Sequence, residues 1–326
     1  MASISAIATH DATHGAPARR PMGLQRAVIT RRVLLGDCTT LRDNARAMFS
    51  RRYWQRPACV VPLGAGRRRG PSAADLAVDV SRQLMGRMPP GSSGRVGAVI
   101  YCHEAPDERM SESTVGRLQF ELALRAANPF AISQAHHTAL WIALDMALGL
   151  VDGPEQAQHV LLVASDKLVF GGPGTDARRL IFGDVAAAAL VSRGEEQGWA
   201  VEQVLLRHFT TPCDALAVWP QAELDAFAQF GAGVLRQALA EGGQAPGNLQ
   251  AVLTTSPDAA FAARVHLGAG LVVPAATAAP RQPQAGSADL LLALAAVEAA
   301  VPAGARVLAW SAGNNGEFAC TVLRRL

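Results

Sequence analysis

The sequence has few charged residues, few aromatic residues and few cysteines for its 326-residue length. Charged residues make up 17% of the chain and hydrophobic residues 50%, which excludes a disordered protein, since such chains combine low hydrophobicity with high charge. The five cysteines are too sparse for a small disulfide-stabilised scaffold, and their number is odd. The length instead allows two domains, or one large α/β unit built from two halves.

Signals for export, membrane insertion and common cofactors are also missing. The N-terminus has no basic segment followed by an apolar one, and the apolar stretch LLLALAAVEAAV is short and contains Glu298. The glycine runs at 171–174 and 268–270 do not form a dinucleotide-binding fingerprint. His103 and Glu104 do not begin a zinc HExxH motif, because Asp107 stands where the second histidine belongs. We therefore expect a cytoplasmic protein with no membrane segment, metal, nicotinamide or flavin.

Positive charge is concentrated near the N-terminus. Residues 1–70 contain thirteen arginines against three aspartates, whereas the other 256 residues are net negative. Such a patch attracts an acidic partner, although a solvated loop surface is an equally good explanation for Arg67–Arg69. Aromatic residues are only 5% of the chain and no nucleic-acid-binding motif accompanies the arginines, so we expect no nucleic-acid partner.

Hydrophobic periodicity predicts alternating strands and helices. In the first half we expect strands at 97–101, 130–132, 159–164 and 185–191, and helices at 72–85, 111–124 and 139–150. In the second half we expect strands at 251–255, 306–310 and 318–323, and helices at 222–240, 258–267 and 287–300. Strands separated by helices predict a predominantly parallel sheet covered on both faces.

Two internal similarities indicate a duplicated architecture. Residues 97–110 resemble residues 250–261, each with a strand, small polar residues, Pro-Asp and then a helix. Residues 183–193 resemble residues 315–325, each with a glycine turn followed by a strand of small residues. The similarities occur in the same order in both halves.

Several stretches taken in order resemble β-ketoacyl-acyl-carrier-protein synthase III of the thiolase superfamily. They are VIYCHEAPDERMSESTVGRLQFELAL, NPFAISQAHHTALWIALDMAL, HVLLVASDKLV, LIFGDVAAAALVS and the closing RVLAWSAGNNGEFACTVLRRL. The resemblance runs from about residue 72 to residue 326, and before residue 70 it implies only a first strand at 3–9. It implies a thiolase-like five-layered αβαβα fold with two similar halves, which we place at 1–193 and 194–326. It also implies a homodimer, or a heterodimer with a synthase III homologue.

The resemblance further implies acyl transfer or Claisen condensation on coenzyme A or acyl-carrier-protein thioesters. In that family a cysteine nucleophile begins a buried helix, and a histidine and an asparagine come from the second half. Here His136 occupies the cysteine position, Ser256 the histidine position and Gln284, within about a residue, the asparagine position. Without a thiolate the usual acyl-enzyme cannot form, so we do not expect ordinary ketosynthase activity.

Other residues are candidates for substrate binding. His137 follows His136, and Cys102 is expected in the pocket wall. Trp54 is a candidate for stacking on an adenine or pantetheine group, with a loop-anchoring role as the alternative. The resemblance places Met110 or Ser111 near a pocket-lining position from the neighbouring subunit. Gly313, Asn314 and Asn315 are candidates for oxyanion contacts.

Two functional hypotheses remain open. In the first, the chain is a divergent acyltransferase of natural-product biosynthesis, and His136 is a general base or transient acyl acceptor. The positive end of the following helix favours neutral imidazole, which is the form that a base needs. In the second, the chain is a catalytically inactive subunit that shapes the acyl pocket of a cysteine-bearing partner.

Overall fold

The computed structural model describes twelve segments of the chain. They are residues 22–32, 71–88, 92–104, 113–133, 135–153, 157–166, 184–193, 198–210, 219–255, 259–272, 286–313 and 316–326. Their strands form one nine-stranded sheet in the order β3-β2-β4-β5-β1-β6-β9-β8-β7. The expected strand at 3–9 lies outside the described residues.

The first half of the chain alternates strands with helices before ending in two strands. Its elements are β1 (Met22–Arg32), α3 (Ala73–Met85), β2 (Val96–Cys102), α4 (Thr114–Glu121), β3 (Asn128–Ile132), α5 (Ala139–Asp152), β4 (His159–Asp166) and β5 (Asp184–Arg193). A short 3₁₀ turn, η2 (His136–Thr138), precedes α5, and another, η1 (Ser92–Arg95), precedes β2.

The second half repeats this plan. Its elements are β6 (Trp199–His208), α6 (Gln221–Glu241), β7 (Leu249–Thr254), α7 (Ala259–Ala269), α8 (Asp289–Val297), β8 (Arg306–Ala312) and β9 (Glu317–Arg325), with the 3₁₀ turns η4 (Pro246–Asn248) and η5 (Gly286–Ala288). In each half a parallel pair of strands is followed by two antiparallel neighbours: β2, β4, β5 and β1 correspond to β7, β8, β9 and β6. The two sequence similarities thus join β2 with β7 and β5 with β9.

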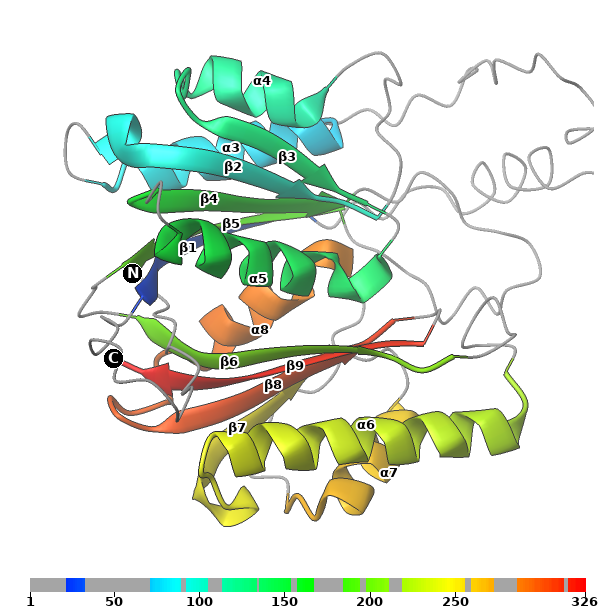
Figure 1. The fold of residues 1–326 in the computed structure, drawn as a ribbon. Coiled ribbons are helices and arrows are strands. Elements are labelled where there is room, and N and C mark those ends of the chain that lie inside the picture. Colours follow the sequence, from blue (N-terminus) through cyan, green and yellow to red (C-terminus); the bar gives the residue numbers. More distant parts are fainter. Residues whose placement is uncertain are drawn as a thin grey trace, which may run out of the picture.

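The halves stack as five layers. Figure 1 shows α3 and α4 on the outer face of the first sheet region, α5 and α8 between the two sheet regions, and α6 and α7 on the outer face of the second. A short antiparallel pairing of β1 with β6, at Gly23 with Ala200 and Leu24 with Trp199, joins the two regions. This is the expected thiolase-like αβαβα arrangement. Within the described residues, no helix has the length and apolar character needed to cross a membrane.

The prediction of a predominantly parallel sheet is wrong. Among the strands that the structure describes, only the pairs β2–β3, β2–β4 and β7–β8 are parallel, and the other five pairs are antiparallel. The antiparallel pairs include β5 beside β4 and β9 beside β8, the strands that precede them in the chain order. Sequence periodicity also missed β1 and β6, which pair antiparallel with β5 and β9 and with each other in the middle of the sheet.

The alanine-rich strand β5 lies between β4 and β1 in the sheet. Its side chains alternate between two cores: Ala187 and Ala189 face the central core with α5, and Ala186 and Ala188 face the outer core with α3. All four are fully buried. Alanine has low strand propensity, but burial on both faces overrides it, and the small side chains let helices approach closely.

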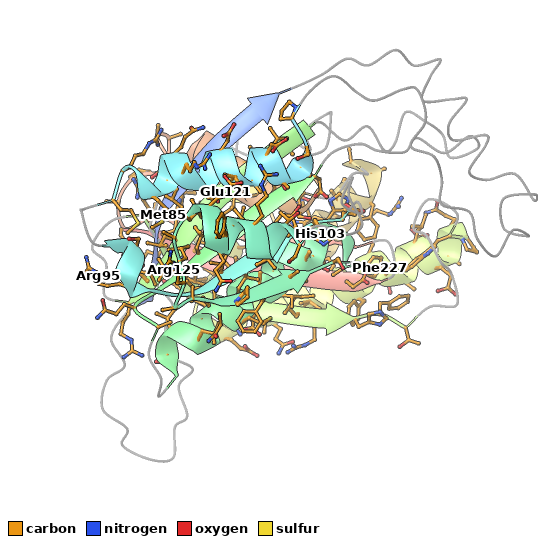
Figure 2. All side chains as sticks on the ribbon, turned by 90° about the horizontal axis from the view of Figure 1, so that it is seen from above. Met85, Arg95, His103, Glu121, Arg125 and Phe227 are labelled. Carbon is orange, nitrogen blue, oxygen red and sulfur yellow. The ribbon has the colours of Figure 1, made fainter. Side chains whose placement is uncertain are left out.

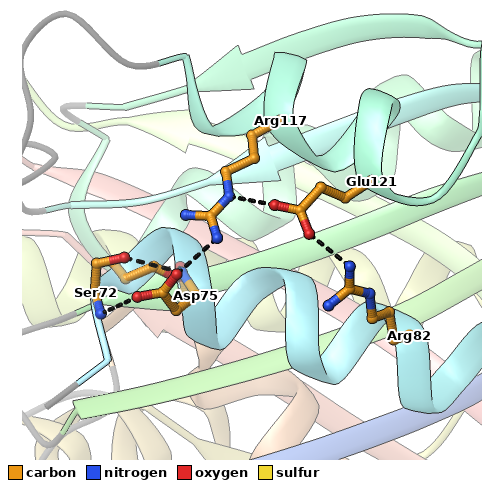
Figure 3. Close-up of polar contacts among 7 residues, drawn as sticks. Ser72, Asp75, Arg82, Arg117 and Glu121 are labelled. Carbon is orange, nitrogen blue, oxygen red and sulfur yellow. Dashed lines mark hydrogen bonds and ion pairs between the residues drawn. The ribbon is translucent and has the colours of Figure 1, made fainter.

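Helix α3 begins at Ala73, one residue after the predicted start, because Ser72 caps it in a capping box. Asp75 N–H donates to Ser72 Oγ at 3.0 Å, and Ser72 N–H donates to the Asp75 carboxylate at 2.8 Å. Arg117 of α4 reaches Asp75 at 2.7 Å and Glu121 at 2.6 Å, and Arg82 of α3 reaches Glu121 at 2.6 Å (Figure 3). These contacts fix α4 against α3 on the outer surface.

Candidate functional site

The carboxyl ends of strands from both halves meet at one end of the sheet. Parallel strands β2 and β4 end there with Cys102 and Asp166. The turns η2 and η5, which precede α5 and α8, contact each other, and η5 contacts β4 while η2 contacts β8 of the second half. Figure 2 shows that His103, which follows β2 at this end of the sheet, lies far from Arg95, which precedes β2. Ligand sites in α/β folds commonly occur at this edge.

The start of α5 carries the two neighbouring histidines. His136 and His137 form η2 with Thr138, whose hydroxyl donates to the Ala135 carbonyl at 2.6 Å. The helix that follows is apolar, and Trp141 within it is fully buried. The backbone of His136 thus lies at the start of a buried helix, as the resemblance implies, while its side chain is outside the described part of the structure.

His137 is buried and faces an acidic residue of the other half. Its Nδ1 lies 3.5 Å from Oδ2 of Asp289, the first residue of α8. Burial alone lowers the pKa of His137, but the interaction with Asp289 and the negative charges of Glu104, Asp289 and Asp166 outweigh it and raise the pKa to about 9. At neutral pH the His137 imidazole is therefore positively charged.

Asp166 joins three segments at the same place. Its Oδ1 accepts the Glu104 N–H at 2.6 Å, and its Oδ2 accepts the Ser287 N–H at 2.7 Å and the Ser287 hydroxyl at 2.8 Å. Burial and the charge of Glu104 raise the pKa of Asp166 to about 6, although these hydrogen bonds act in the opposite direction. Asp166 is the last residue of β4, so the strand continues two residues beyond the end expected at 164.

Cys102 lies next to the start of α5 but is poorly suited to nucleophilic attack. Its thiol is fully buried, and its Sγ contacts the Ala139 carbonyl at 3.6 Å. Burial, with a further contribution from the charge of Asp166, raises the pKa of this thiol far above its ordinary value. Burial likewise raises the pKa of Cys320 to about 12. Both thiols are therefore protonated at neutral pH.

Most other predicted site residues lie outside the described part of the chain. These are Ser256, Gln284, Met110, Trp54, Asn314 and Asn315. Gly313 is described: its N–H donates to the Glu317 carbonyl at 2.7 Å, within the turn between β8 and β9. An oxyanion contact from this N–H would have to replace that hydrogen bond.

Sequence reasoning missed the acidic partners of His137. Asp166 ends an apolar buried strand and Asp289 begins an apolar helix, whereas Glu104 was considered only as part of a zinc motif. A carboxylate at the end of a buried strand was the available signal. Among the described residues, no group of three or more His, Cys, Asp or Glu side chains is arranged to hold a metal ion.

Comparison with known proteins identifies the fold. Residues 132–208 match the family model of 3-oxoacyl-(acyl-carrier-protein) synthase III, and this segment includes His136 and the start of α5. No curated protein matches the sequence.

Solved structures match over most of the chain. The priming β-ketosynthase of a polyketide biosynthetic pathway is 19% identical with a TM-score of 0.68, covering 96% of this chain and 98% of that one. β-Ketoacyl-(acyl carrier protein) synthase III from Thermus thermophilus is 22% identical with a TM-score of 0.63, covering 78% and 85%. The acyltransferase ChlB3 is 18% identical with a TM-score of 0.62, covering 78% and 85%. The chain therefore has the thiolase-type fold of synthase III enzymes, and its segment 132–208 matches that family.

Proposed function

We propose that this chain is a synthase III-like acyltransferase of natural-product biosynthesis. It moves an acyl group from a carrier-protein or coenzyme A thioester to an alcohol, amine or thiol acceptor. The observation that carries the proposal is the pair of histidines at the start of α5, where His137 is buried and ion-paired with Asp289. The similarity in fold to an acyltransferase, ChlB3, supports the same class of reaction.

His136 is the proposed general base. As the acceptor attacks the thioester carbonyl, His136 takes the proton from the acceptor O–H, N–H or S–H. The carbon–sulfur bond then breaks, and the leaving thiolate takes this proton from His136. The products are the acylated acceptor and a free thiol, so the reaction needs no oxidant, reductant or further cofactor.

His137 has a different proposed role because it is charged. An imidazole with a pKa of about 9 cannot act as a base at neutral pH, but it supplies a fixed positive charge. In the buried site this positive charge stabilises the negative charge that develops on the thioester carbonyl oxygen. Two neighbouring cations repel, so it also favours the neutral form of His136, which a general base requires.

The arginines before residue 70 are the proposed receptor for the acidic carrier protein or for the phosphates of coenzyme A. We also propose that the protein is cytoplasmic and acts as a dimer, either with a second copy of itself or with a synthase III homologue. The acyl-carrying phosphopantetheine enters as substrate and not as a resident cofactor.

A second function is favoured by the residues at the other two catalytic positions. Ser256 and Gln284 stand where the family resemblance expects histidine and asparagine, so all three positions differ. This is the pattern expected of an inactive subunit that shapes the acyl pocket of a cysteine-bearing partner. In that case His136 and His137 have only structural roles.

One assay separates the two functions. The purified protein is incubated with acyl-coenzyme A or acyl-carrier protein and a panel of acceptors, alone and with a cysteine-bearing synthase III homologue encoded nearby. Release of free thiol and acylated product is measured. The same assay is run with His136→Ala and with the control His159→Gln, which removes a histidine at the opposite end of β4.

The acyltransferase proposal expects activity from the chain alone, with a fall of roughly 10²–10⁴-fold in His136→Ala and little change in His159→Gln. Activity that appears only with the homologue, and is unchanged in His136→Ala, would contradict the proposal and support the inactive-subunit function.

A further inference from the structure

The hydrogen bonds of Asp166 connect the two halves of the chain at the candidate site. We call the group formed by the Asp166 carboxylate, the Glu104 N–H and the N–H and hydroxyl of Ser287 the Asp166 clasp. Glu104 follows β2, Asp166 ends β4, and Ser287 lies in η5, immediately before α8. Because Asp166 and Ser287 are both buried, water does not compete for these bonds.

The turn that carries Ser287 is shaped around this carboxylate. Gly286 has a φ of +55°, a conformation that favours glycine. A Cβ atom added to Gly286 would also collide with Oδ2 of Asp166 and lie 3.0 Å from its Cγ. Both the backbone conformation and the close approach therefore require glycine at this position.

Helix α8 depends on the clasp for the placement of its first residue. The residue at its N-cap is Ala288, whose side chain makes no capping hydrogen bond. The first N–H groups of a helix need acceptors from elsewhere, and the preceding Ser287 N–H finds one in Asp166. Two residues after Ser287, Asp289 begins the helix and faces His137.

We propose that Asp166 is a positioning residue that, through Ser287, holds Asp289 against His137 and so keeps His137 positively charged. The proposal rests on the function proposed above for the role of that charge in catalysis, but the placement itself is a property of the fold. The charged groups that act on His137 are Asp289 from α8, Glu104 after β2 and Asp166 from β4. From β8, the uncharged Ser311 contributes a hydroxyl that donates to the His137 carbonyl at 3.4 Å.

The decisive variant is Ser287→Ala, because it weakens the clasp without removing a charge. The titration of His137 is followed by NMR in histidine-labelled protein, with the signal assigned by its loss in His137→Gln. If Asp289 moves away from His137, the pKa of His137 falls, and we expect a fall of roughly one unit. Asp289→Asn serves as the reference for complete loss of the partner charge and should give at least as large a fall.

Ser192→Ala is the matched control. It also removes a buried serine hydroxyl that makes a side-chain hydrogen bond, but at the other end of β4, where Ser192 Oγ lies 2.6 Å from His159 Nδ1. We expect Ser192→Ala to alter the titration of His159 and to leave that of His137 unchanged. If Ser287→Ala does not fold, Ser287→Cys keeps a side chain of similar shape with a weaker donor, and a smaller fall in the same direction is expected.

A wild-type His137 titration in the folded Ser287 variant would overturn the proposal. The titration needs no acyl substrate, so it tests the positioning role of Asp166 separately from the acyl-transfer assay. A fall in the His137 pKa without detectable acyl transfer would support the Asp166 clasp and contradict the proposed function. Where acyl transfer is observed, Ser287→Ala should move the alkaline limb of the kcat profile to lower pH with little change in KM. An unmoved limb would contradict the positioning role.

Discussion

His137 and Asp289 come from different halves of the chain and meet in its interior, with Nδ1 of one 3.5 Å from Oδ2 of the other. His137 lies in the turn before α5, and Asp289 is the first residue of α8, so the pair links the two central helices at their starts. Burying a charge is costly unless a partner compensates it, and here the carboxylates around His137 supply that compensation. The duplicated fold thus brings both halves to one site.

This pair should give the protein a distinctive loss of stability at alkaline pH. The pKa of His137 is about 9 in the folded protein, above its ordinary value of 6.5. A group whose pKa is raised by folding makes its full contribution to the stability of the folded protein at pH values below its unfolded pKa. This contribution is lost as the pH rises through the folded pKa. The free energy of unfolding of the wild type, measured with urea, should therefore fall between pH 6.5 and pH 9. The His137→Gln variant should lack this part of the pH dependence. Equal pH dependence in the two proteins would contradict the assignment.

His266 should produce the opposite dependence. Trp310 Nε1 donates to His266 Nε2 at 2.9 Å, so this nitrogen must carry no proton. Burial lowers the pKa of His266, and its stabilisation is present above the ordinary histidine pKa and lost as pH falls through the lower folded value. We expect the wild type to lose more stability on acidification from pH 7 than His266→Gln does. His208→Gln, at an exposed histidine of β6, is the control and should behave as the wild type.

Local sequence signals predicted most elements of the fold. The start of α3 follows from Ser72 and Asp75, because a capping box is contained within four residues. Strand direction could not be predicted in the same way, since it depends on which strands become neighbours. The antiparallel pairing of β4 with β5 and of β8 with β9 is a tertiary fact that periodicity does not encode.

In the candidate site, too, local motifs could be predicted from the sequence, whereas contacts between distant residues could not. The two histidines were found because they stand in a recognisable motif before an apolar helix. Their acidic surroundings were not, since Asp289 follows His137 by about half the length of the chain and Asp166 is distant from both in sequence. Only the folded arrangement of η2, η5 and β4 brings these charges together.

The described cysteines should resist alkylation in the folded protein. Cys102 and Cys320 are both buried, and burial raises their thiol pKa values. Because the thiolate is the reactive form, N-ethylmaleimide should modify neither residue under native conditions and both after unfolding in urea, as measured by peptide mass spectrometry. Rapid native modification of Cys102, with loss of acyl transfer, would contradict the histidine-based proposal.

Two glycines of α6 should respond oppositely to alanine. A Cβ added to Gly231 would collide with Cε2 of Phe318 and lie 2.9 Å from Cδ2 and 3.0 Å from Cζ, whereas one added to Gly233 has only Arg236 Nη2, at 3.9 Å, within 4 Å. The Phe318 ring cannot easily move, because it stacks on Trp310 at 5.2 Å and packs edge-on against Phe227 at 6.2 Å.

The expected outcome follows from two competing effects. Alanine in a helix interior is more stable than glycine by about 0.5–1 kcal/mol, so Gly233→Ala should raise the free energy of unfolding by about that amount. At Gly231 the same gain is opposed by overpacking that typically costs about 1–3 kcal/mol, so Gly231→Ala should lower the free energy of unfolding. Urea unfolding at pH 7 measures both. Equal stabilisation in the two variants would show that α6 can move away from β9, and that the aromatic cluster around Phe318 does not fix their spacing.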